Sequence, residues 1–141
     1  AVALFSGAYL ANRALAFVAP VAALLLSDLF LGFYPELLFV YLSVAAIVVV
    51  GWAISRRKSA GRIAAAALAS SLLFYLVTNF GVWLVMDYYP KTIAGLAACY
   101  VAAIPFFQNT LAGDMVFSAL LFGGFALAGP SVPGLREPQP A

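Results

Sequence analysis

The chain has 141 residues, of which 66% are hydrophobic and only 9% are charged. Soluble domains carry about a quarter charged residues, so this composition excludes an ordinary soluble domain and indicates an integral membrane protein. The net charge of +2 gives no reason to expect nucleic acid, and the absence of histidine excludes imidazole metal sites and Ser-His or Cys-His catalysis. Cys99 lies alone in an apolar run, so we expect a buried thiol.

The first half of the chain predicts a short apolar segment and two spans. Residues 1–10 are apolar but too short to cross a bilayer, which needs about 20 helical residues, and we interpret them as the end of a truncated helix. Residues 14–33 have spanning length and contain Pro20 and Asp28, and residues 38–55 form an uncharged second span. A polar turn with Tyr34 and Glu36 separates the two spans.

A basic loop follows the second predicted span. Residues 56–62 contain four of the seven basic residues of the chain, namely Arg56, Arg57, Lys58 and Arg62. Basic residues are enriched in short cytoplasmic loops, so we expect this loop in the cytoplasm and Glu36 on the opposite side.

Residues 63–86 form the longest uncharged run and begin with small residues that let helices approach closely. Further along, Tyr75, Asn79 and Trp83 recur every four residues and therefore share one helical face. Asn79 lies at membrane depth, where an amide either joins two helices or contacts a ligand.

Residues 104–114, IPFFQNTLAGD, bring several polar side chains together inside an otherwise apolar run. The preceding residues 92–107 either span or fold back as a re-entrant or interfacial segment. We favour the fold-back, because about 16 residues are marginal for a span and Pro105 interrupts the run. Residues 110–129 then form the last span, with Asp114 in its first turn and with Gln108 and Asn109 beside it on the outer side.

The predicted fold is therefore all-α. We expect a polytopic transmembrane bundle of about five to six helices in residues 1–129, with a short re-entrant or interfacial helix before the last span. Residues 130–141 are rich in proline and glycine, so we expect a disordered tail.

Two resemblances follow from specific segments. Residues 12–35 (NRALAFVAPVAALLLSDLFLGFYP) and residues 89–124, which include YPKTIAGLAACYVAAIPFFQNTLAGD, resemble an uncharacterised bacterial family of small integral membrane proteins. Residues 7–32, GVWL at 81–84 and PFFQNTLAGD at 105–114 are more weakly similar to the substrate-binding S components of energy-coupling-factor vitamin transporters, especially the biotin-type ones.

The S-component resemblance implies six helices, with both termini in the cytoplasm and the first helix missing here. It also implies an energy-coupling membrane subunit and an ATPase as partners. Two departures argue against biotin as the ligand. The spacing from PF to GD is longer than in the biotin-type proteins, and Phe117 stands where those proteins carry a lysine.

Three functions remain open at this stage. The first is substrate binding or transport of a small vitamin-like molecule in the bacterial inner membrane, with a pocket near the outer face and no cofactor or metal. The second is a structural or accessory subunit without a ligand. The third, least favoured, is an intramembrane enzyme with Asp28 and Asp114 as paired carboxylates; we expect no enzyme. The candidate ligand-binding residues are Tyr75, Asn79, Trp83, Asn109, Asp114 and Asp28.

Overall fold

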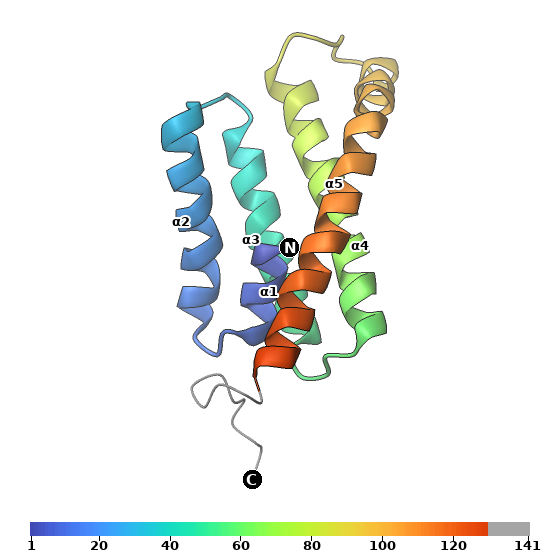
Figure 1. The fold of residues 1–141 in the computed structure, drawn as a ribbon. Coiled ribbons are helices and arrows are strands. Elements are labelled where there is room, and N and C mark those ends of the chain that lie inside the picture. Colours follow the sequence, from blue (N-terminus) through green and yellow to red (C-terminus); the bar gives the residue numbers. More distant parts are fainter. Residues whose placement is uncertain (130–141) are drawn as a thin grey trace.

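The computed structural model describes residues 1–129, and these fold into five α-helices without a strand (Figure 1). The helices are α1 (Val2–Tyr9), α2 (Arg13–Leu31), α3 (Leu37–Ile54), α4 (Ala60–Val85) and α5 (Ile93–Ala128). The predicted all-α class is thus confirmed. The predicted disordered tail, residues 130–141, lies outside the described residues.

Short polar residues fix where the helices begin. Asn12 accepts hydrogen bonds from the backbone of Ala14 and Leu15 at the start of α2. Ser59 and Thr92 cap α4 and α5 in the same way. Such caps satisfy backbone N–H groups that a helix start leaves without partners. At the end of α2, Gly32 has a φ of 95°, a conformation that glycine adopts without a steric penalty.

Four helices, α2 to α5, are long and apolar enough to cross a membrane. Their outward surfaces carry large apolar side chains, with Phe30 88%, Leu31 82% and Ile93 89% exposed. Such surfaces suit lipid rather than water. With eight residues, α1 is too short to cross a bilayer, as the sequence predicts.

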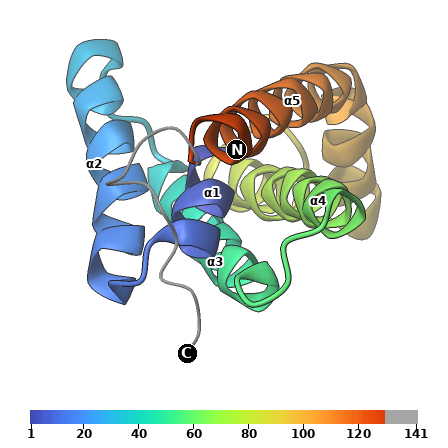
Figure 2. The same cartoon turned by 60° about the horizontal axis from the view of Figure 1, so that its bottom comes forward.

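The prediction for the last third of the chain needs correction. Residues 92–107 and 110–129 do not form two segments, because α5 runs without interruption from Ile93 to Ala128. A separate re-entrant helix is therefore not confirmed. Pro105 lies inside α5, where proline removes a backbone hydrogen bond and bends the helix. Figures 1 and 2 show the gold N-terminal part of α5 running at an angle to the orange part.

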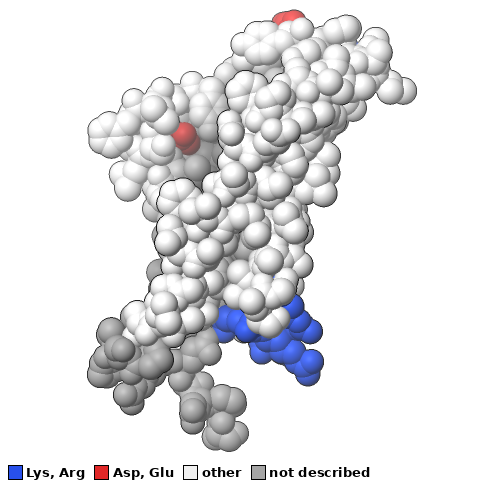
Figure 3. All heavy atoms as spheres, turned by 45° about the vertical axis from the view of Figure 1, so that its right-hand side comes forward, with Lys and Arg blue, Asp and Glu red and all other residues white. Residues whose placement is uncertain are grey.

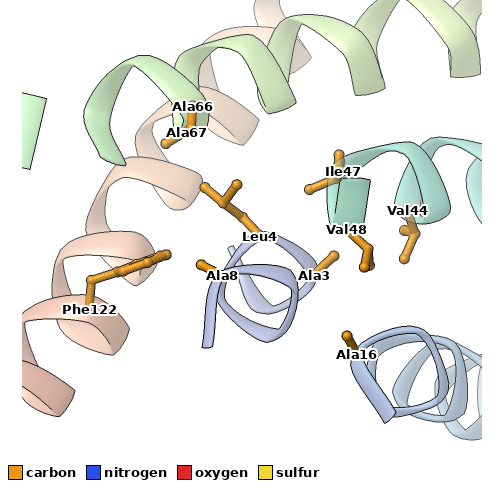
Figure 4. Packing of buried hydrophobic residues seen from close by; sticks show 10 residues of the cluster. All are labelled: Ala3, Leu4, Ala8, Ala16, Val44, Ile47, Val48, Ala66, Ala67 and Phe122. Atoms are coloured by element: carbon orange, nitrogen blue, oxygen red, sulfur yellow. The ribbon is translucent and has the colours of Figure 1, made fainter. Parts of the chain in front are cut away.

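The short helix α1 lies inside the bundle and contacts all four of the others (Figures 1 and 2). Its residue Leu4 is fully buried. Figure 4 shows Leu4 between α3 and α4, with Ile47 and Ala67 nearby, while Phe122 of α5 approaches Ala8. In lipid, helices associate through close packing because burial from lipid gives no hydrophobic gain. The buried core is therefore organised around α1.

The tightest contact in the core joins α1 to α3. A Cβ atom placed on Gly7 would lie 2.2 Å from the backbone oxygen of Val48, and one on Gly51 would lie 2.4 Å from that of Leu4. Both neighbours are backbone atoms, which cannot rotate away as a side chain can. The two backbones therefore approach this closely only with glycine at both positions.

Most basic residues of the described part of the chain lie at one end of the molecule, and Lys91 in the turn between α4 and α5 is the exception. The loop between α3 and α4 carries Arg56, Arg57 and Lys58. Figure 3 shows lysine and arginine gathered at this end of the molecule, and the acidic residues visible on this face lie in the other half.

Gly51→Ala should destabilise the protein by about 1–3 kcal/mol, because the added methyl group forces α1 and α3 apart. The measurement is the unfolding temperature of the purified protein in detergent micelles. Gly124→Ala is the matched control, because a Cβ on Gly124 meets no atom within 4 Å. Equal unfolding temperatures for the two variants would contradict the role given to the α1–α3 contact.

Candidate functional site

Two adjoining cavities lie between the helices. The larger one, the Asp114 cavity, has a volume of about 350 Å³ and a mostly apolar lining. It is lined by Ala1, Val2, Ala3, Pro20, Ala23, Leu24, Val44, Ile47, Phe74, Thr110 and Asp114. The smaller one, the Asn79 cavity, has about 200 Å³ and is lined by Phe74, Tyr75, Thr78, Asn79, Ala103, Phe106, Phe107 and Thr110. Phe74 and Thr110 line both cavities, so these two side chains form part of the wall between them.

Asp114 supplies the carboxylate of the larger cavity. One carboxylate oxygen accepts a hydrogen bond from the Ser71 hydroxyl at 2.7 Å, and the other accepts one at 2.8 Å from the N-terminal ammonium of Ala1, with which it forms an ion pair. Ser71 is fully buried, whereas the side chain of Asp114 remains 21% exposed. An ionised carboxylate offers about four acceptor positions, so two occupied positions leave room for further donors.

Tyr75 and Asn79 lie together, as predicted, but their polar groups are used within the bundle. The Tyr75 hydroxyl donates to the backbone oxygen of Tyr100 on α5. The Asn79 amide donates to the backbone oxygen of Tyr75 at 2.8 Å, within its own helix. These bonds satisfy polar groups that would otherwise be costly at membrane depth. The Asn79 cavity therefore has fewer donors for a ligand than the sequence indicates.

The third residue on the predicted face, Trp83, lies apart from both cavities. Its indole N–H donates to the backbone oxygen of Pro90 at 3.0 Å. The Lys91 ammonium donates to the backbone oxygens of Trp83 and Met86 and lies 5.9 Å from the centre of the indole ring. Trp83 therefore holds the turn between α4 and α5.

Asp28 belongs to a different helix pair. It is only 3% exposed and accepts a hydrogen bond from the Tyr41 hydroxyl at 2.8 Å, which joins α2 to α3. In the loop beyond α2, burial and then the charges of Asp28 and Glu36 raise the pKa of the Tyr34 phenol. Asp28 and Asp114 thus sit in separate hydrogen-bond pairs, and no group of three potential metal ligands occurs in residues 1–129.

Asn109 does not line either cavity and is exposed on α5. Of the six predicted residues, the structure places Asp114 on one cavity and Tyr75 and Asn79 on the adjoining one.

Sequence reasoning missed Ser71 and Thr110 as site residues. Thr110 precedes Asp114 by four residues, and this helical spacing would have placed both on one face. Ser71 contacts Asp114 only because α4 packs on α5. The spacing of residues within one helix cannot predict such a contact between two helices.

Two adjacent serines of α4 give a test of the Asp114 contact. Ser71→Ala should destabilise the protein by about 1–3 kcal/mol, because it removes a hydrogen bond to a carboxylate at membrane depth. Ser70→Ala should be neutral or slightly stabilising, because the buried Ser70 hydroxyl has no hydrogen-bond partner among the described residues. Denaturant titration of both variants in micelles measures the difference. A larger loss for Ser70→Ala would exclude the Ser71–Asp114 bond as a stabilising contact.

Comparison with known proteins identifies a family but not a function. No curated protein and no solved structure matches the chain, so the resemblance to S components gains no support from relatives. The expectation of an uncharacterised family is confirmed. The chain belongs to a family of unknown function (DUF6580), whose model matches residues 1–135.

Proposed function

We propose that this membrane protein binds a small, largely apolar molecule that carries N–H donors, in the Asp114 cavity. The observation that carries the proposal is a partly exposed carboxylate on the wall of a mostly apolar cavity at membrane depth. Ionisable residues in such positions are costly and typically mark binding or transport sites.

The dimensions of the cavity suit this kind of ligand. Its volume of about 350 Å³ lies at the lower end of the range of roughly 300–1,000 Å³ typical of small-molecule sites. Phe74 and Leu24 offer apolar contact area, and Asp114 would fix the orientation of the ligand through its remaining acceptor positions. A longer ligand would extend past Phe74 and Thr110 into the Asn79 cavity.

The orientation of the protein is part of the proposal. The gathered basic residues of loop 56–62 favour a cytoplasmic position for that loop in a bacterial inner membrane. Asp114 lies 14 residues before the end of α5 at Ala128, or about 21 Å along the helix. The cavity would then lie in the extracytoplasmic half of the bilayer.

Delivery of the ligand across the membrane is a further element of the proposal. The segments that resemble S components favour a transport component that works with an energy-coupling membrane subunit and an ATPase. Asp114 and Thr110 both belong to the PFFQNTLAGD segment that carries this resemblance, and both line the Asp114 cavity.

A second candidate function is a structural or accessory subunit without a ligand and without enzymatic activity. The bonds of Tyr75, Asn79 and Trp83 to backbone oxygens favour this role for the face of α4 that carries these three residues. It does not account for the exposed part of Asp114 or for the cavity beside it.

Binding can be tested with a panel of small alkyl and aryl amines and their neutral hydroxyl and methyl analogues. We expect at least one amine to raise the unfolding temperature of the protein in micelles by several degrees. Asp114→Asn should abolish this shift, because the neutral amide is a weaker acceptor for N–H donors. Leu24→Trp should also abolish it, because the larger ring fills the cavity.

Two matched variants serve as controls in this assay. Asp28→Asn neutralises the other intramembrane aspartate, and Leu25→Trp adds the same ring to an exposed neighbour that does not line the cavity. Both should keep the shift. Equal shifts from amines and their methyl analogues, or loss of the shift in Leu25→Trp alone, would reject the proposed site.

The proposed orientation predicts the labelling of single cysteines in a Cys99→Ser background. A membrane-impermeant maleimide added to intact bacterial spheroplasts should modify Tyr88→Cys but leave Gly61→Cys unmodified until the cells are lysed. Tyr88 is 70% exposed, and Gly61 has open space around it, so both positions accept cysteine. The reverse labelling pattern would show that the protein has the opposite orientation in the membrane.

A further inference from the structure

A third cavity, the α4–α5 groove, lies apart from the proposed ligand site, at the basic end of the bundle. It has a volume of about 430 Å³. It is lined by Tyr9, Lys58, Ala60, Ile63, Ala64, Ala67, Met115, Ser118, Ala119, Phe122, Gly123 and Ala126. Its walls thus combine small apolar residues of α4 and α5 with one charged and one hydroxyl side chain.

The hydroxyl side chain is Ser118. It is only 3% exposed, and its oxygen is buried without a hydrogen-bond partner in the described part of the chain. A buried hydroxyl without a partner is costly, and most buried polar atoms have one. Because Ser118 lines the groove, an occupant with an acceptor atom would complete its bonding.

The charged side chain is Lys58, whose ammonium lies 4.5 Å from the centre of the Tyr9 ring. Arg56 and Arg57 precede it in the same loop, and Arg62 follows in the first turn of α4. Figure 3 shows this end of the molecule as strongly basic. The groove therefore opens beside a positive patch at the level where lipid headgroups would lie.

We propose that the α4–α5 groove is a binding site for one anionic phospholipid. Such a lipid presents an anionic phosphate, then ester carbonyl acceptors, then an acyl chain. The Lys58 ammonium would pair with the phosphate, the Ser118 hydroxyl would donate to an ester carbonyl, and the small residues of both helices would contact the chain. The charge of the loop favours an anionic headgroup over a zwitterionic one.

The size of the groove favours a lipid over a partner helix. Two turns of a helix about 10 Å in diameter and 11 Å long would fill roughly 850 Å³, about twice the volume of the groove. A helix would therefore rest on the rim and leave Ser118 without a partner, whereas a single acyl chain enters between the small residues.

Native mass spectrometry of the full chain, with phosphatidylglycerol or phosphatidylcholine added to the micelles, tests the site. We expect one phosphatidylglycerol adduct to survive detergent removal at least fivefold more abundantly than the phosphatidylcholine adduct. Gly123→Leu should abolish this adduct by filling the groove. Lys58→Gln should keep lipid binding but reduce the preference for phosphatidylglycerol to near equality.

Gly124→Leu is the matched control, because it adds the same side chain one residue along α5, outside the groove. Its adduct should match that of the unmodified protein. If Gly123→Leu does not fold, Ala126→Leu takes its place at another lining position with an exposed side chain.

Three results would overturn the proposal. These are equal adducts of both lipids in the unmodified protein, equal losses in Gly123→Leu and Gly124→Leu, and a dimer that Gly123→Leu dissociates without changing the lipid adduct. The last result would assign the groove to a second copy of the chain.

Discussion

The close approach of α1 and α3 at Gly7 and Gly51 is the contact on which the rest of the bundle depends. It brings a helix of only eight residues deep enough to contact the other four. Leu4 then packs between α3 and α4, and Phe122 of α5 closes over Ala8. Because close packing drives helix association in lipid, the absence of a Cβ atom at Gly7 and Gly51 is what lets α1 pack this closely on α3.

Polar side chains in the bundle mostly bond to the nearest backbone or to one neighbouring side chain. Asp28 pairs with Tyr41, and Tyr75 with the backbone of Tyr100. Asp114 differs, because its hydrogen bonds come from two other segments of the chain and it still faces a cavity. This combination distinguishes a candidate binding group from one that only joins helices.

Much of the fold follows from the sequence, because the length of apolar runs and the polar turns between them fix the four long helices. The continuity of α5 does not follow, since proline permits both a bend and a break in a helix, and the residues around Pro105 do not distinguish the two. For the site, helical spacing correctly placed Tyr75 beside Asn79. It could not show that their donors are used internally or that Ser71 reaches Asp114, because both facts depend on how two helices pack.

The hydrogen bonds between α4 and α5 also bear on how the protein is assembled during synthesis. Tyr75 and Tyr100 each donate to a backbone oxygen of the opposite helix, and the Cys99 thiol lies 3.4 Å from the backbone oxygen of Asn79. In a helical hairpin that forms these bonds, the polar groups have partners before the hairpin enters lipid, where polar groups without partners are costly. The Ser71–Asp114 hydrogen bond joins the same two helices, so α4 and α5 could leave the insertion machinery as a pair with these polar groups already bonded to each other.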